Sequence, residues 1–284
     1  MNWLAVHFDL ADPGFWVFIA IAIAILATNV AWLVAHLVAQ ARPAAAARWL
    51  GSDLARAAAW LIASLWLLAP PFYAWRYGAI SPALLGITEI DWVESLVAGG
   101  PFAGLVILLA VFGWLVYRHE LPIGEGAPAG ESRLLTTLRA MVDAGLLQWH
   151  LAFARASLIA WLSARLVLPG PPFASILRAA QDQPFYWGSW LGLGVVLMEA
   201  ILNPFVRDSL CAPSATERRQ GRPEALLRDL ALLLATTALF LLARNFWLCL
   251  ACHVAVNTLI AGWLPLYRPA HTTKVPDTSE VPGT

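Results

Sequence analysis

Charged side chains are scarce in this sequence, and lysine is almost absent. Only 13% of the 284 residues are Asp, Glu, Lys or Arg, the formal net charge is zero, and Lys274 is the only lysine. Nucleic-acid binding depends on basic surfaces that offset phosphate charge. A chain with balanced charge offers no such basis, so we expect no nucleic-acid partner.

Cysteine is also rare, and the N-terminus lacks the parts of a removable signal peptide. The three cysteines are Cys211, Cys249 and Cys252, an odd number that argues against a disulfide framework and favours small buried side chains. Residues 1–14 carry neither a basic n-region nor a small-residue cleavage site. We therefore expect the first long apolar run to be a retained span.

Apolar surface is what the sequence has in abundance. Hydrophobic residues make up 60% of the chain, 15 residues are Trp, and the mean hydropathy is +0.68. A water-soluble domain needs far less apolar surface than this, and several runs reach the roughly 20 residues that cross a bilayer core. We predict an all-α, multi-pass transmembrane helical bundle.

Polar or Pro/Gly-rich links divide the apolar sequence into about seven expected spans. These spans are residues 15–39, 54–73, 102–117, 151–168, 185–206, 226–243 and 246–266, the fourth being the second half of a helical stretch over 134–168. Pro70-Pro71 is expected to end or kink the second span. Gly99-Gly100-Pro101 is expected to open the third, and Asn203-Pro204 to break the fifth.

Basic residues alternate between rich and poor links along the chain. The rich links follow the first, third, fifth and seventh spans, and their basic residues are Arg42, Arg48, Arg56, Arg118, Arg133, Arg207, Arg218, Arg219, Arg222, Arg268 and Lys274. By the positive-inside rule, the N-terminus lies outside and the C-terminus lies in the cytoplasm. This pattern predicts a multi-pass protein of the inner cell membrane with the lipid bilayer as its surroundings.

The spans suggest four consecutive regions. Residues 1–14 form a short N-terminal segment, 15–133 a three-span region, 134–267 a four-span region, and 268–284 a polar tail that we expect to be disordered.

Three polar side chains inside expected spans are the candidate catalytic residues: Glu199, His253 and Asn257. His253 and Asn257 are four residues apart, so they share one face of a helix. A carboxyl group, an imidazole and an amide together could activate water and stabilise an oxyanion, which is the chemistry of peptide hydrolysis. The alternative is that all three only hold helices together through hydrogen bonds.

Residues 245–263 resemble the last motif of the CAAX-protease and bacteriocin-processing family of intramembrane proteases. The resemblance rests on Asn245-Phe246-Trp247 followed by the His253-x-x-x-Asn257 pair. Residues 190–205 are similar to the family's Glu-Glu-x-x-x-Arg helix and contain Glu199. The resemblance covers about the last 100 residues and implies an intramembrane endopeptidase acting on membrane-associated peptides or proteins.

The chain departs from the family pattern at several positions. Met198-Glu199 stands where the family has two Glu, the first of them catalytic, and Asn203 stands where it has Arg. The family's second His motif is missing, since there is no His between His150 and His253. These departures keep a second function open, a catalytically inactive subunit that binds another membrane protein or lipid.

Two further features bear on this choice. Arg155, in the fourth expected span, needs an anionic partner such as Glu199 or Asp143, and pairing with Arg155 would make Glu199 structural. Cys249-Leu-Ala-Cys252-His253 matches the C-x-x-C-H pattern of covalent haem attachment, although its place inside an apolar span argues against haem. The same three side chains lack an evident fourth ligand for zinc, so we expect no metal site, and no cofactor is specified.

Overall fold

The computed structural model describes residues 10–41, 53–120, 133–164, 173–211 and 222–260, and in this part of the chain the regular structure is entirely helical. The helices are α1 (Pro13–Ala41), α3 (Asp53–Arg76), α4 (Pro82–Leu85), α5 (Trp92–Glu120), α6 (Arg133–Ser163), α7 (Phe173–Asp182), α8 (Pro184–Leu202), α9 (Pro204–Cys211), α11 (Arg222–Ala243) and α12 (Phe246–Thr258). The prediction of an all-α fold is confirmed.

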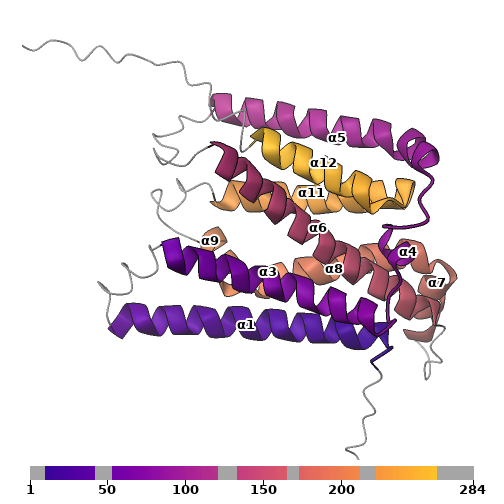
Figure 1. The fold of residues 1–284 in the computed structure, drawn as a ribbon, viewed down its shortest axis with the longest axis horizontal. Helices are drawn as coiled ribbons and strands as arrows, with labels where there is room; N and C mark the ends of the chain where they lie inside the picture. Colours follow the sequence, from indigo (N-terminus) through magenta and orange to yellow (C-terminus); the bar gives the residue numbers. More distant parts are fainter. Residues whose placement is uncertain (1–9, 42–52, 121–132, 165–172, 212–221, 261–284) are drawn as a thin grey trace, which may run out of the picture.

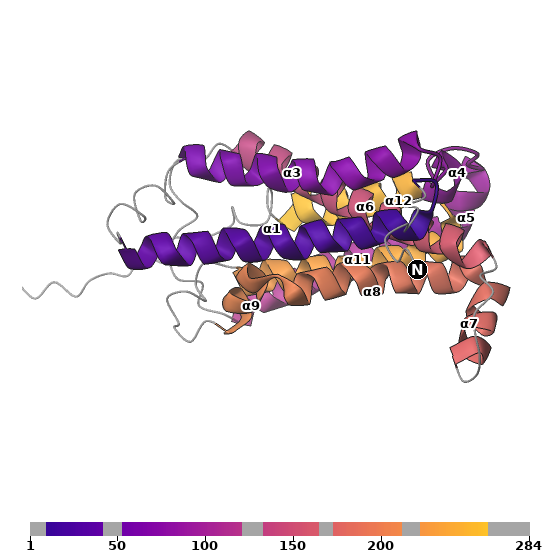
Figure 2. The same ribbon diagram turned by 90° about the horizontal axis from the view of Figure 1, so that it is seen from below.

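The long helices lie roughly along one common axis, and α6 crosses the middle of the bundle at an angle (Figure 1). α6 packs against α8 on one side and against α12 on another, while α1, α3 and α4 cover further parts of it. α7 projects sideways from the end of the bundle where α8 begins (Figure 2). The chain is therefore organised around α6, which packs against more of the other helices than any other helix does.

Four of the described helices are long and apolar enough to cross a membrane. They are Pro13–Val38, Trp92–Tyr117, Pro184–Leu202 and Leu226–Ala243. The last of these coincides with the expected sixth span. Spans at α3, α6 and α12, the orientation of the termini and the division into four regions stay predictions.

Two helices extend beyond the boundaries predicted for them. α3 does not end at Pro70-Pro71 but continues to Arg76, so the kink expected there stays a prediction. α5 begins at Trp92, ahead of the Gly99-Gly100-Pro101 sequence expected to open it, so that prediction is wrong. Gly99 explains the second difference, because a Cβ there would lie 2.7 Å from the Cβ of Ala243 on α11. This glycine provides a close helix contact instead of a helix start.

Two other predictions are confirmed in part or in full. α6 is one continuous helix through the junction of its amphipathic and apolar halves, but it ends at Ser163, and residues 165–168 of the expected stretch lie outside the described residues. α8 ends at Leu202, where Asn203 takes an extended conformation and accepts a hydrogen bond from the Phe205 amide at 3.0 Å before Pro204 begins α9. Pro204 is tolerated there because the first turn of a helix does not use the missing N–H.

α6 and α8 approach each other closely because two glycines on α8 face α6. A Cβ on Gly188 would lie 2.7 Å from the backbone nitrogen of Ile159, and one on Gly192 would lie 2.6 Å from the Cα of Arg155. Their spacing is Gly-x-x-x-Gly, the arrangement that lets helix backbones pack directly in membranes. This contact sets the position of α8 along the axis of α6.

Only Arg244 and Asn245 join α11 to α12. Arg244 has a φ of 49°, a left-handed conformation that a non-glycine residue adopts at a cost of roughly 1–3 kcal/mol. Its amide donates to the Phe240 carbonyl at 2.8 Å, and the Asn245 side chain caps α12 by accepting from the Leu248 amide at 3.1 Å. The two helices therefore form a tight antiparallel hairpin.

Candidate functional site

A buried hydrogen-bonded chain joins α11, α6 and α12. The Thr236 hydroxyl donates to the Leu232 carbonyl at 2.7 Å and accepts from Gln148 Nε2 at 2.8 Å. Gln148 Nε2 also lies 2.7 Å from His253 Nδ1. Gln148, Thr236 and His253 are each at most 1% exposed, so the chain lies in the interior of the bundle.

The direction of these bonds fixes the proton on His253. Thr236 uses its single hydroxyl proton on the Leu232 carbonyl, so it can only accept from Gln148. The second amide proton of Gln148 then donates to His253 Nδ1, which must be an acceptor. The proton of a neutral imidazole is therefore on Nε2. Within the described residues, that buried N–H and Gln148 Oε1 have no hydrogen-bond partner.

Asn257 extends the polar surface of α12 by one turn beyond His253. Its side chain lies near the carboxylate of Asp229 on α11, while its Oδ1 finds no partner among the described residues. Asp229 is 32% exposed and Asn257 only 5%. Polar groups thus lead inward from the partly exposed Asp229 to the fully buried His253.

Glu199 lies on another side of α6. His150 Nε2 is 2.6 Å from Glu199 Oε2, and the two side chains are 2% and 8% exposed. Gln148 and His150 are two residues apart, so they point about 200° apart around α6. The three predicted site residues are therefore not brought together. His253 and Asn257 lie on the side of α6 that faces α11 and α12. Glu199, on α8, lies on another side of α6, where it pairs with His150.

Replacing His150 is expected to destabilise the protein more than replacing its partner Glu199. His150→Leu leaves a buried carboxyl group without its partner and should lower the free energy of unfolding by about 2 kcal/mol. Glu199→Gln keeps an acceptor for the His150 N–H and should cost less than about 1 kcal/mol. Unfolding titrations in mixed micelles measure both variants, and equal losses would show that the pair is not the stabilising contact.

Arg155 has neither of its predicted partners. Glu199 pairs with His150, and Asp143 forms an ion pair with Arg139 at 3.8 Å. Arg155 is fully buried, and its guanidinium carbon lies 3.2 Å from the centroid of the Phe240 ring. Its side-chain nitrogens make no hydrogen bond within the described residues. A cation–π contact thus replaces the expected ion pair.

The two thiols of the C-x-x-C-H sequence point to different helices. Cys249 Sγ donates to the Thr236 carbonyl on α11 at 3.3 Å, and Cys252 Sγ contacts the Ala103 carbonyl on α5 at 4.0 Å. Both cysteines are free and buried. Covalent haem attachment needs two accessible thiols, so these residues do not fit it. Within the described residues, no group of three or more His, Cys, Asp or Glu side chains could hold a metal ion.

No family model, curated protein or solved structure matches the chain.

Sequence reasoning missed the partners of the site residues. Gln148 is 105 residues from His253 and 88 from Thr236, and His150 is 49 from Glu199. One signal was available: Gln148 and His150 are strongly polar and lie where α6 becomes apolar. Polar groups in such a segment need partners on neighbouring helices.

Proposed function

We propose that the chain is a multi-pass protein of the inner cell membrane, related to the CAAX-protease and bacteriocin-processing family, that binds a membrane-associated peptide without hydrolysing it. The four apolar helices support the membrane location. The alternating basic links support a cytoplasmic C-terminus.

One observation carries the choice of binding over catalysis: the side chain that faces His253 is the amide of Gln148. A neutral amide cannot accept a proton from water, so it cannot serve as a general base. The intramembrane carboxylate of Glu199 is on another side of α6 and bonded to His150.

The same groups suit recognition of a peptide bond. The unpartnered His253 N–H can donate to a carbonyl, and the unpartnered oxygens of Gln148 and Asn257 can accept from an amide N–H. A ligand that satisfies these buried groups removes the cost of leaving them unpaired, about 1–3 kcal/mol each. The ligand we propose is a segment of a membrane-associated peptide with a free backbone amide.

A quenched fluorescent peptide ending in a prenylated cysteine tests both halves of this proposal in proteoliposomes. We expect the wild-type protein to cleave it no faster than Glu199→Gln or protein-free vesicles. We expect His253→Phe to weaken binding of the intact peptide about tenfold, because one buried hydrogen bond is lost. His36→Phe, the same substitution at an exposed position on α1, should bind like the wild type.

The alternative is a membrane endopeptidase that uses the Glu199–His150 pair. It is favoured by the free Oε1 of Glu199 and the free Nδ1 of His150, which find no partner within the described residues. Cleavage of the peptide by the wild type that Glu199→Gln abolishes would establish this alternative. Absence of both cleavage and His253-dependent binding would overturn the proposal.

A further inference from the structure

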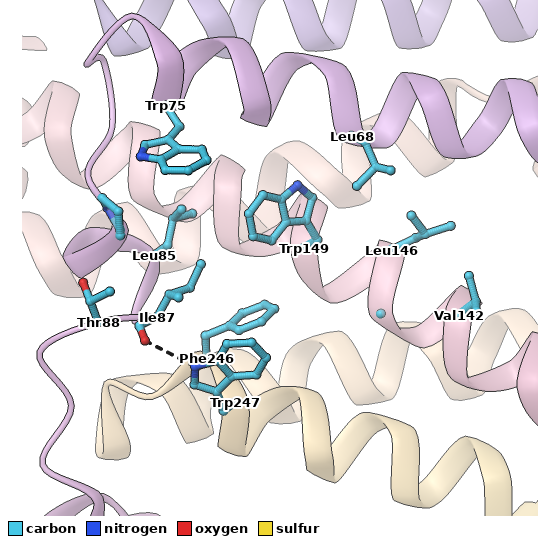
Figure 3. A pocket seen from close by; sticks show the side chains of 12 residues that line it. Leu68, Trp75, Leu85, Ile87, Thr88, Val142, Leu146, Trp149, Phe246 and Trp247 are labelled. Atoms are coloured by element: carbon cyan, nitrogen blue, oxygen red, sulfur yellow. Dashed lines mark hydrogen bonds between the residues drawn. The ribbon is translucent and has the colours of Figure 1, made fainter.

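Two outward features of the bundle differ in what they can recognise. One is a groove of about 650 Å³ between α3, α6 and α12, lined by side chains such as Leu68, Trp149 and Phe246 (Figure 3). Its lining is almost entirely apolar, so it does not distinguish one apolar occupant from another. The other is the outward face of α1, which carries polar side chains and can therefore select a partner.

α1 forms one edge of the bundle. It lies at the lower edge in Figure 1, and in Figure 2, which shows the bundle from that side, it lies in front of the other helices. Its buried residues include Ala20 and Ala24, which are 1% and 3% exposed, and α1 packs against α6 and α3. Leu26, 67% exposed, points about 200° away from Ala24. One side of α1 thus lies in the bundle, and the opposite side is open.

Polar side chains gather on this open side of α1. Six exposed residues there are spaced alternately by four and three positions: Ala22, Leu26, Asn29, Leu33, His36 and Gln40. We call these six residues the α1 stripe. A seven-residue repeat of this kind keeps one seam of a helix against a parallel helix that crosses it at about 20°. The α1 stripe therefore has the spacing of a contact between two helices.

Asn29 places an amide within the hydrocarbon layer. The apolar span Pro13–Val38 has 26 residues, and Asn29 precedes its end at Val38 by roughly 13 Å, at about 1.5 Å per residue. Asn29 Nδ2 donates one proton to the Ile25 carbonyl at 2.8 Å. The other amide proton and Oδ1 make no hydrogen bond within the described residues. Polar groups at this depth are costly unless a neighbouring helix supplies their partner.

A second copy of the chain supplies a matching group at the same depth. All copies cross the membrane in the same direction, so a two-fold axis along the membrane normal sets two α1 helices parallel, with like residues facing each other. Asn29 then meets Asn29 of the partner subunit. Each amide has both a donor and an acceptor, so the pair can exchange hydrogen bonds. His36 and Gln40 already bond each other at 2.8 Å, which leaves Asn29 as the group to be matched.

We propose that the protein forms a homodimer through the α1 stripe, in which Asn29 is hydrogen-bonded to Asn29 of the partner subunit inside the membrane. Leu26 and Leu33 pack on either side of this polar pair. The inference goes beyond the peptide-binding proposal and is independent of it, because Gln148, Thr236 and His253 lie between α6, α11 and α12 and not on α1.

The oligomeric state of the purified full chain in proteoliposomes tests the proposal. Single-molecule photobleaching, with one dye at the amino terminus and a series of protein-to-lipid ratios, gives the dissociation constant of the dimer. We expect Asn29→Leu to weaken the dimer about tenfold, because it removes the hydrogen bonds and keeps an apolar contact. Asn29→Gln keeps a donor and an acceptor and should weaken it less.

Val34→Ala is the control for the dissociation constant and should leave it unchanged. Val34 is 53% exposed on α1 but lies outside the α1 stripe. Asn29 is itself exposed and bonded only within α1, so its replacement leaves the interior of the bundle intact. A wild-type protein that stays monomeric at every ratio, or a dimer that Asn29→Leu does not weaken, would overturn the proposal.

Cysteine cross-linking locates the interface independently. Leu33 and Val34 are neighbours with similar exposure, 49% and 53%, but only Leu33 belongs to the α1 stripe. In a Cys211→Ser background, Leu33→Cys should form a disulfide-linked dimer under copper–phenanthroline several-fold faster than Val34→Cys. Cys249 and Cys252 are buried and should give no background. Equal rates at the two positions would indicate random collision and overturn the proposal.

Discussion

Replacing Phe240 with alanine is expected to lower the free energy of unfolding by about 5–7 kcal/mol. The ring is 1% exposed and stacks on Phe185 with centroids 5.4 Å apart, so its removal leaves a cavity. The ring is also the neighbour that stabilises the buried guanidinium of Arg155, 3.2 Å from its centroid. Truncation thus combines a cavity cost of about 3–5 kcal/mol with loss of a desolvated cation–π contact of about 2 kcal/mol.

A double-mutant cycle separates these two contributions. Arg155→Met removes a buried charge that lacks hydrogen bonds within the described residues, so this variant should be as stable as the wild type or more stable. In that background Phe240→Ala should cost about 2 kcal/mol less. Phe112→Ala, at a position 66% exposed on α5, is the control and should have little effect on unfolding in mixed micelles. Identical costs of Phe240→Ala in the two backgrounds would show that the ring does not stabilise Arg155.

Gly192→Ala is expected to lower the free energy of unfolding by about 3 kcal/mol, although it adds only one methyl group. The new Cβ would lie 2.6 Å from the Cα and 2.7 Å from the nitrogen of Arg155. Both are backbone atoms, so no side-chain rotation relieves the overlap and α8 must move away from α6. That movement also disturbs the Glu199–His150 bond, which joins the same two helices.

Gly194→Ala is the matched control, two residues along the same helix. A Cβ there meets no atom within 4 Å, so the substitution adds helix propensity without a clash. It should raise the free energy of unfolding by up to about 1 kcal/mol. Unfolding titrations of both variants give the comparison. Equal effects at the two positions would mean that α6 and α8 are not in direct backbone contact.

The features predicted correctly from the sequence are those that depend on residues close together in the chain. The spacing of His253 and Asn257 places them on one face of α12, and both are buried. Asn203-Pro204 ends α8, because proline cannot continue a helix without disturbing the preceding turn. The apolar run from Leu226 to Ala243 gives the same bounds in the structure.

The sequence could not show which helices are neighbours. The helices α1, α5, α8, α11 and α12 are apolar over most of their length, so composition does not distinguish the faces that touch. Glu199 finds His150 and His253 finds Gln148 only because α6 lies between α8 and α12. Gly99 was misread for the same reason, since its role is set by Ala243, 144 positions away in the chain.

The short link between α11 and α12 has a consequence for biogenesis. Only Arg244 and Asn245 lie between the two helices, so we expect α11 and α12 to enter the membrane together as one unit. Arg228 and Asp229 on α11 and Asn257 on α12 would each be costly to transfer alone. In a hairpin that inserts as a whole, Asp229 and Asn257 lie close together from the start, so each polar side chain has the other as a neighbour.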